Sequence, residues 1–271
     1  TSCQQKESKK YFKKYDESAE LEAQQKHERN RMQFKLIQSK YLDMNEVFKP
    51  FEKELATFSE ENYENLKPLI LEQDIPSLQK SVKNGELSYE NLTKFYLYRI
   101  RKFESDSSLY LNSIIALNSN VINEAKEKDK NRDTEIDEYF AEMSIYGMPI
   151  LLKDNINTKD MPTTAGAIAL AENKTTEDAF IVEKLRENGA LILGKVNLSE
   201  WAYFFCSGCP LGYSAIGGQT LNPYGRKVFE TGGSSAGSGV ATAANFAVAT
   251  VGTETAAPFA KTLREPKPDA G

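Results

Sequence analysis

The sequence predicts an α/β fold, in which a mixed central sheet is covered by helices. Short apolar runs typical of buried strands alternate with helical segments between residues 146 and 252. Glycine points to the same region, because every glycine except Gly85 lies from Gly147 onward, where the backbone must turn tightly or approach a ligand. With 271 residues, 40% of them hydrophobic, the chain is long enough to form a globular core.

Hydrophobic spacing places the individual elements. In residues 88–103 the apolar positions recur at helical spacing, which predicts an amphipathic helix with one buried face, and Ser88 is a suitable N-cap. Residues 149–153 and 190–196 are short apolar runs typical of buried strands. In full, we expect strands at 111–117, 149–153, 190–196 and 246–252, and helices at 75–82, 88–103, 121–132, 176–188 and directly after Ser235.

Residues 1–66 form a charged extension ahead of the predicted domain, which we place at residues 67–271. Residues 4–66 are rich in Lys, Glu and Gln, with helical apolar spacing only from Phe34 to Phe58. This composition is typical of a solvated helix or a flexible tether. We therefore expect a solvent-facing extension that carries no chemistry.

Charge and composition exclude several functional classes. The net charge of −5 and the pI near 5.3 argue against a nucleic-acid-binding protein. No apolar run approaches the roughly 20 residues of a membrane-spanning helix. The single histidine, His27, lies in a charged N-terminal run, and there are three cysteines. Histidine-based catalysis and a Cys/His zinc site are therefore disfavoured.

Three segments carry candidate catalytic or ligand-binding residues. Lys153 follows a buried apolar strand, where desolvation would lower its pKa and make it a competent general base, although a lysine after a strand is often a surface residue. The loop at 231–239, Thr-Gly-Gly-Ser-Ser-Ala-Gly-Ser-Gly, would present backbone N–H groups to an anion. It lacks the Gly-Lys-Ser/Thr ending of a phosphate-binding P-loop. The third segment, Val-Gly-Thr-Glu-Thr at 251–255, closes the last strand.

Together with three further blocks, these segments resemble the amidase signature family, the Ser–cis-Ser–Lys hydrolases. The further blocks are Leu-Glu-Gln-Asp-Ile at 71–75, Gly-Lys-Val-Asn-Leu-Ser-Glu-Trp-Ala at 194–202 and Gly-Gly-Gln-Thr-Leu-Asn-Pro-Tyr at 217–224. The last block is closer to the peptide-amidase-like branch than to the tRNA-dependent amidotransferase A subunit. The resemblance implies the N-terminal portion of an amidase-signature fold.

The resemblance also implies roles for three residues. Lys153 would be the neutral base at the end of a proton relay, Ser234 the relay serine on a cis peptide bond, and Ser235 a support for the network. The implied reaction is hydrolysis of a small-molecule or peptide amide to a carboxylic acid and ammonia or an amine, with neither a metal nor an organic cofactor. This is a Ser-Lys variant of activated-nucleophile chemistry.

The chain departs from the family where the nucleophilic serine is expected. That position is Pro258, which has neither a hydroxyl group nor a backbone N–H. The preceding turn, expected to form the oxyanion hole, consists of Thr255, Ala256 and Ala257. Loss of one oxyanion donor alone typically costs about 10²–10³ in rate. We therefore expect impaired hydrolysis.

The polar, proline-containing tail that follows Phe259 also fails to continue the family pattern. Loss of one base from codons for Ala-Gly-Ser-Ile could produce Ala-Ala-Pro-Phe, so we interpret the chain as a frameshifted or truncated amidase. Two alternatives stay open, namely a non-catalytic binding protein with an amidase fold and an amidotransferase A-subunit-like protein.

The cysteines add two further expectations. Thr1-Ser2-Cys3 is typical of the end of a bacterial lipoprotein signal, in which Cys3 would be lipidated and anchor the protein to a membrane outside the cytoplasm; otherwise a cytoplasmic location is expected. Cys206 and Cys209 form a CxxC motif without a redox or zinc context, consistent with two small buried side chains or with a disulfide. Nearby Trp201 and the aromatic residues 203–205 are expected to pack in the core.

Overall fold

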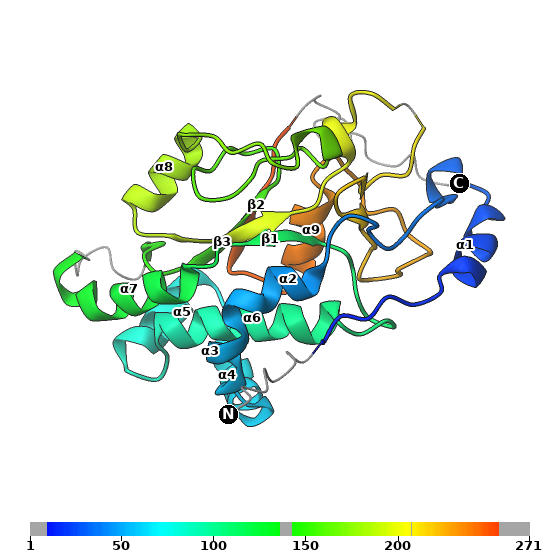
Figure 1. The fold of residues 1–271 in the computed structure, drawn as a ribbon. Coiled ribbons are helices and arrows are strands. Elements are labelled where there is room, and N and C mark those ends of the chain that lie inside the picture. The colour runs from blue at the N-terminus through cyan, green and yellow to red at the C-terminus, as the bar shows by residue number, and fades with distance from the viewer. Residues whose placement is uncertain (1–9, 136–142, 207, 255–271) are drawn as a thin grey trace, which may run out of the picture.

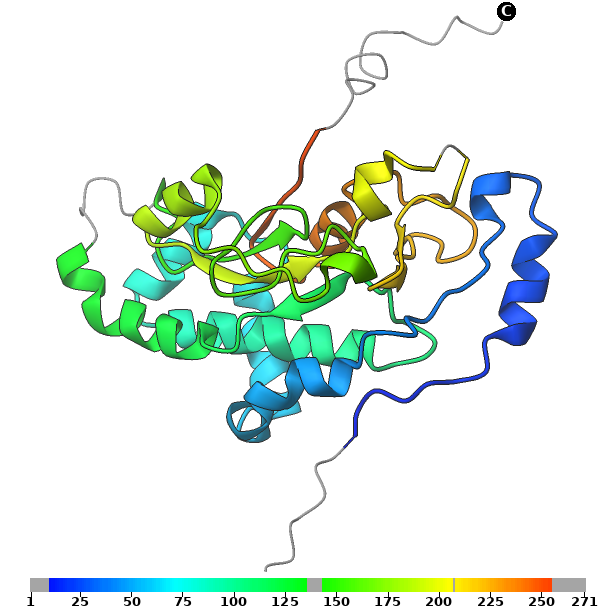
Figure 2. The same cartoon turned by 45° about the horizontal axis from the view of Figure 1, so that its top comes forward.

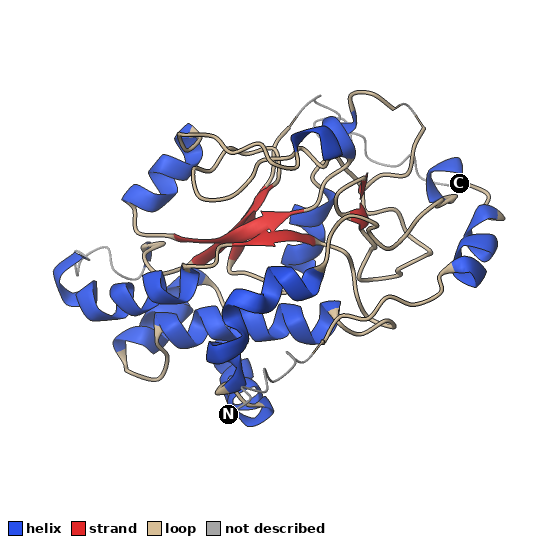
Figure 3. Ribbon diagram, in the orientation of Figure 1, coloured by secondary structure: helices blue, strands red, loops and turns tan. Residues whose placement is uncertain are grey.

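A four-stranded mixed sheet forms the centre of the computed structural model, which describes residues 10–135, 143–206 and 208–254 (Figures 1 and 3). The strand order is β1-β3-β2-β6, in which β2 pairs in parallel with both β3 and β6, and β1 pairs antiparallel with β3. The strands are β1 (Ile114–Leu117), β2 (Pro149–Lys153), β3 (Leu191–Val196) and β6 (Ala249–Val251). The predicted α/β fold with a mixed sheet is therefore confirmed.

Two hydrophobic cores lie on opposite faces of this sheet. The larger core joins Leu151 and Leu193 to helices α6 and α9. The smaller core joins Ile150 and Leu152 to Val182 of α8, and Figure 1 shows α8 on the opposite side of the sheet from α6. The helices are α5 (Ile75–Lys83), α6 (Tyr89–Glu104), α7 (Val121–Glu135), α8 (Phe180–Glu187) and α9 (Ala236–Ala243).

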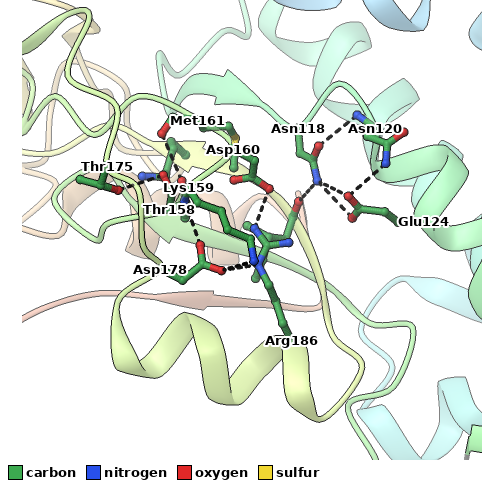
Figure 4. Close-up of polar contacts among 12 residues, drawn as sticks. Asn118, Asn120, Glu124, Thr158, Lys159, Asp160, Met161, Thr175, Asp178 and Arg186 are labelled. Carbon is green, nitrogen blue, oxygen red and sulfur yellow. Dashed lines mark hydrogen bonds and ion pairs between the residues drawn. The ribbon is translucent and has the colours of Figure 1, made fainter.

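Local capping explains where several helices begin. The Ser88 side chain accepts a hydrogen bond from the backbone N–H of Asn91, as the sequence predicts for the start of α6. Helix α8 begins at Phe180 rather than at 176, because the residues before it bond to a neighbouring loop. The Lys159 N–H donates to the Asp178 carboxylate, and the Thr175 hydroxyl donates to the Thr158 carbonyl (Figure 4).

The N-terminal segment packs on the rest of the molecule, so the prediction of a solvent-facing extension is wrong for residues 10–66. The Gln219 N–H donates to the Ile37 carbonyl at 2.9 Å, and Lys227 pairs with Glu20 at 2.6 Å. Apolar residues spaced among the charges supply buried side chains to the larger core. These are Met32, Phe34, Ile37, Phe48, Phe51, Leu55, Phe58 and Tyr63.

Short helices make up this N-terminal segment, which runs around one side of the molecule in Figure 2. They are α1 (Ser18–Gln25), η1 (Asn30–Met32), α2 (Met44–Phe48), η2 (Lys49–Phe51), α3 (Glu52–Ala56) and α4 (Glu60–Ile70). The expected boundary between residues 66 and 67 therefore falls inside α4.

The remaining elements lie in the loops around the sheet. They are η4 (Ile168–Leu170), η5 (Glu200–Tyr203) and a small hairpin of β4 (Tyr213–Ser214) and β5 (Gly218–Gln219). Among the helices of the described ranges, none combines the length and the apolar character needed to span a bilayer.

Candidate active site

Lys153 ends strand β2 with its side chain fully buried, at 0% exposure. Its Nζ donates to Ser234 Oγ at 2.7 Å and to Thr253 Oγ1 at 2.8 Å. Ser234 lies in the loop before α9, and Thr253 follows β6. Because β2 and β6 are parallel neighbours and α9 packs against both, the fold brings together three segments that are far apart in sequence.

Close backbone packing fixes the position of Ser234. The Ser199 N–H donates to the Ser234 carbonyl at 3.0 Å, and the Gly237 N–H donates to the Asn197 carbonyl at 2.9 Å. A Cβ atom on Gly237 would lie 2.2 Å from that carbonyl oxygen, so only glycine allows α9 to begin this close to the end of β3. The peptide bond between Gly233 and Ser234 is cis.

Ser235 and Asn155 both contact Thr253. The Ser235 hydroxyl donates to the Thr253 carbonyl at 3.1 Å and accepts from the Thr253 N–H at 3.2 Å. Asn155 Nδ2 donates to Thr253 Oγ1 at 3.1 Å. The sequence assigns no role to Thr253 or Asn155, although Thr253 lies within the 251–255 motif and Asn155 lies in the lysine motif, two residues after Lys153. Position within a motif was the available signal, but it does not show which side chains face the lysine.

Burial sets the electrostatics of the site. It lowers the pKa of Lys153 from 10.5 to about 8, and the carboxylate of Glu254 partly opposes this change. A measurable fraction of Lys153 is therefore neutral near neutral pH. A neutral amine 2.7 Å from a hydroxyl oxygen is able to accept its proton.

The structure does not describe the other predicted site residues. Thr255, Ala256, Ala257 and Pro258 lie outside the described residues, as does Cys3. The turn expected to carry the nucleophile and the oxyanion donors therefore stays a prediction. Of the predicted site residues, the structure places Lys153, Ser234 and Ser235.

The loop after Ser199 differs from the sequence-based expectation. Cys206 and Cys209 are joined by a disulfide bond. The aromatic residues beside them were expected to pack in the core, which is wrong for Phe204 and Phe205, since they are 78% and 74% exposed. Strand β3 ends at Val196, and residues 204 and 205 lie on the molecular surface, so these side chains have no core to enter.

The fold agrees with comparisons to known proteins. Residues 91–257, more than half of the chain, match the Amidase family, so the chain belongs to the amidase family. A probable amidase of Arabidopsis thaliana is 37% identical over 187 residues, which are 69% of this chain and 35% of that protein. The A subunits of bacterial glutamyl-tRNA(Gln) amidotransferases are also similar, at 31% identity for the Sulfurihydrogenibium protein over 68% of this chain and 35% of its own length.

Solved structures show the same relationship. An amidase family protein from Bacillus anthracis superimposes with a TM-score of 0.74 at 39% identity, covering 81% of this chain and 43% of that one. The peptide amidase from Stenotrophomonas maltophilia superimposes with a TM-score of 0.59 at 43% identity, covering 65% of this chain and 35% of that one. The chain thus spans about a third of the length of the curated relatives it matches.

Proposed function

We propose that this chain carries the lysine and serine part of a site that hydrolyses linear carbon–nitrogen amide bonds. The observation that carries the proposal is the 2.7 Å contact between buried Lys153 Nζ and Ser234 Oγ. Membership of the amidase family supports it independently. The Ser-cis-Ser-Lys relay is our assignment of roles to these residues.

In this mechanism, neutral Lys153 accepts the proton of the Ser234 hydroxyl. Ser234 in turn accepts the proton of a nucleophilic hydroxyl, whose oxygen attacks the amide carbonyl carbon. When the C–N bond breaks, the relay returns the proton to the leaving nitrogen, which departs as ammonia or an amine. Water then attacks the acyl ester while the same relay takes its proton and returns it to the nucleophilic oxygen as the ester C–O bond breaks, which releases the carboxylic acid.

Pro258 limits this reaction in the present chain. The family resemblance puts the nucleophilic hydroxyl at position 258, and proline cannot supply one. We therefore propose that hydrolysis is impaired, and that the chain in its present form acts at most as an amide-binding protein. The resemblance to peptide amidase favours a peptide amide as substrate. We propose that the reaction uses neither a metal nor an organic cofactor.

Ammonia release from a C-terminal peptide amide tests the proposal. We expect no turnover above background for the chain itself and measurable turnover for a version that carries the family's Gly-Ser-Ile at 257–259 and the C-terminal part of a full-length relative. In that background, Lys153→Met or Ser234→Ala should reduce the rate by about 10²–10⁴-fold, the usual contribution of general acid–base catalysis. Equal rates with and without Lys153 would exclude the relay.

An amidotransferase A-subunit-like function is the second candidate, favoured by the similarity to the A subunits of glutamyl-tRNA(Gln) amidotransferases. Such a protein would require partner subunits. Co-purification of the tagged chain from its native cells would show whether such partners bind, and a chain recovered alone would count against this candidate.

We also propose that Cys3 is lipidated and holds the chain at a membrane outside the cytoplasm. The Thr1-Ser2-Cys3 sequence is the basis of this proposal. Mass spectrometry of the membrane fraction tests it, since recovery of an unmodified Cys3 peptide there would contradict it.

A further inference from the structure

A second buried lysine, Lys195, lies beside Lys153 but on the opposite face of the sheet. Strand β3 has one extra residue, Leu193, between the pairs Ile150–Ile192 and Leu151–Gly194. This bulge reverses the alternation of side chains, so Lys195 pairs with Leu152 of the smaller core and Val196 pairs with Lys153. The Lys195 side chain is fully buried, at 0% exposure.

Lys195 holds both ends of the loop that follows Lys153. Its Nζ donates to the Ile156 carbonyl at 2.6 Å and to Thr163 Oγ1 at 2.9 Å. Asp154, which belongs to this loop, fixes it further, because its carboxylate accepts hydrogen bonds from the hydroxyl and the N–H of Thr164. The Asp154 carbonyl also accepts from the Ala165 N–H at 3.0 Å. Together the two buried side chains tie residues 154–165 to the sheet.

Charged side chains from several parts of the fold surround Lys195 and Asp154. Burial lowers the pKa of Lys195 to about 8 and raises that of Asp154 to about 6, while the opposite charge of each partner resists these changes. The negative charges of Asp160 and Asp178 also oppose the lowering of the Lys195 pKa. Both are bound by Arg186 of α8, at 2.6 Å and 3.1 Å, and Lys159 lies 3.6 Å from Asp178 (Figure 4).

A short chain of contacts connects Lys195 to Lys153. The Ile156 N–H donates to the Lys153 carbonyl at 3.0 Å and closes a turn that contains Asn155. Asn155 Nδ2 donates to Thr253 Oγ1, the same oxygen that Lys153 Nζ contacts. The carbonyl held by Lys195 therefore belongs to the turn that sets the position of Asn155 and, through it, of Thr253.

One atom of Asp154 makes an unfavourable contribution to the stability of the fold. Asp154 Oδ1 is buried without a hydrogen-bond partner among the described residues. Buried charged side chains are weak evidence for stability, and an unsatisfied buried oxygen is unfavourable. A role in positioning a neighbouring group gives a reason for keeping these charges in the interior.

We propose that Lys195 and Asp154 are positioning residues for Lys153. They hold the 153–156 turn in place, so that Asn155 and Thr253 exclude water from the Lys153 amine and orient it toward Ser234. This inference rests on the proposed function for its catalytic meaning. The positioning itself is a property of the folded chain and is measurable without turnover.

The test is the titration of the Lys153 amine in the full chain, followed by NMR of lysines labelled with ¹³C at Cε. The Lys153→Met variant identifies the signal. We expect Lys195→Met and Asp154→Asn each to raise the Lys153 midpoint toward that of an ordinary lysine, by about one pH unit, a tenfold change in the protonation equilibrium. Lys174→Met, at an exposed lysine, should leave it unchanged.

The two variants separate positioning from simple charge coupling. Removing a positive charge at Lys195 and a negative charge at Asp154 would move the Lys153 midpoint in opposite directions if only charge mattered, with Glu254 facing Lys153 unchanged in both. Shifts of opposite sign, or no shift in either variant, would overturn the proposal. Amide hydrolysis is scored separately, so a chain without turnover can still show the shift.

Asn155→Ala covers the case in which a buried variant fails to fold. Asn155 is half-buried and contacts Thr253 without lying in either core, so this variant should fold. We expect it to raise the Lys153 midpoint in the same direction and by a smaller amount. An unchanged midpoint in a folded Asn155→Ala protein would show that the position of the turn does not affect the protonation of Lys153.

Discussion

Lys153 and Lys195 occupy neighbouring positions on strands β2 and β3, yet their ammonium groups lie on opposite faces of the sheet. The extra residue Leu193 in β3 produces this arrangement, since it places Lys195 beside Leu152 rather than beside Lys153. One amine reaches Ser234, and the other reaches the loop at 154–165. Both are buried, and burial lowers the pKa of both from 10.5 to about 8.

These two lysines predict a stability that rises with pH above about 8. The folded protein releases their protons near pH 8, whereas the unfolded chain keeps them until about 10.5. Between these values the unfolded state binds more protons, so the free energy of unfolding increases with pH. Lys153→Met should weaken this increase by about 1–3 kcal/mol, as one lysine no longer contributes.

Urea unfolding at pH values on either side of 8 measures this effect, and Lys174→Met serves as the control that should keep the slope of the native chain. The upper limit of the series is near pH 10, where unfolded tyrosines begin to ionise. Burial raises the pKa of Tyr89 to about 12, so its ionisation above pH 10 favours unfolding instead. A slope that is the same in Lys153→Met and the native chain would show that Lys153 is not protonated differently on folding.

Gly194 is predicted to be required at the bulge of β3. A Cβ atom there would lie 2.2 Å from the Ala116 carbonyl oxygen and 3.0 Å from Leu117 Cδ2. Gly194→Ala should therefore destabilise the protein by about 1–3 kcal/mol, the usual cost of overpacking. Gly239→Ala is the matched control, because Gly239 is an exposed position of α9 and nothing lies within 4 Å of its added Cβ. That substitution should stabilise by about 0.5–1 kcal/mol. Thermal unfolding of both variants compares them, and equal effects would contradict the steric argument.

The strands and the main helices were predictable because their signals are local. The apolar run 149–153, the spacing around Phe95 and the N-cap at Ser88 each depend on a few adjacent residues. The nearness of Lys153 and Ser234 was anticipated only through the family resemblance. Nothing in their separation along the chain indicates that β2 and α9 pack together.

The features that escaped prediction depend on tertiary contacts. The N-terminal segment carries its apolar residues between many charges, so its burial against Gln219 and Lys227 is not visible in its composition. The role of Lys195 depends on a bulge that changes the face of the sheet on which the side chain lies. Simple alternation along 190–196 would have placed it on the other face.

The disulfide between Cys206 and Cys209 predicts a distinct alkylation pattern. In protein denatured without reductant, the peptide that contains both cysteines should take up no iodoacetamide, and after reduction it should take up two equivalents. Mass spectrometry of the digested protein measures both states. Two equivalents before reduction, in protein prepared under oxidising conditions, would show that the cysteines are free.

Ile37 is predicted to stabilise the whole fold, although it lies in a segment whose composition suggests a tether. Its side chain is fully buried in the larger core, and its carbonyl accepts from the Gln219 N–H and from Asn112 Nδ2. Ile37→Ala should therefore lower the free energy of unfolding by about 2–5 kcal/mol, as for other buried aliphatic residues. Lys35→Ala, two residues away and exposed, should change it by less than about 0.5 kcal/mol. Chemical denaturation of the two variants measures the difference. If Ile37→Ala were as mild as Lys35→Ala, residues 10–66 would not share the core of the sheet domain.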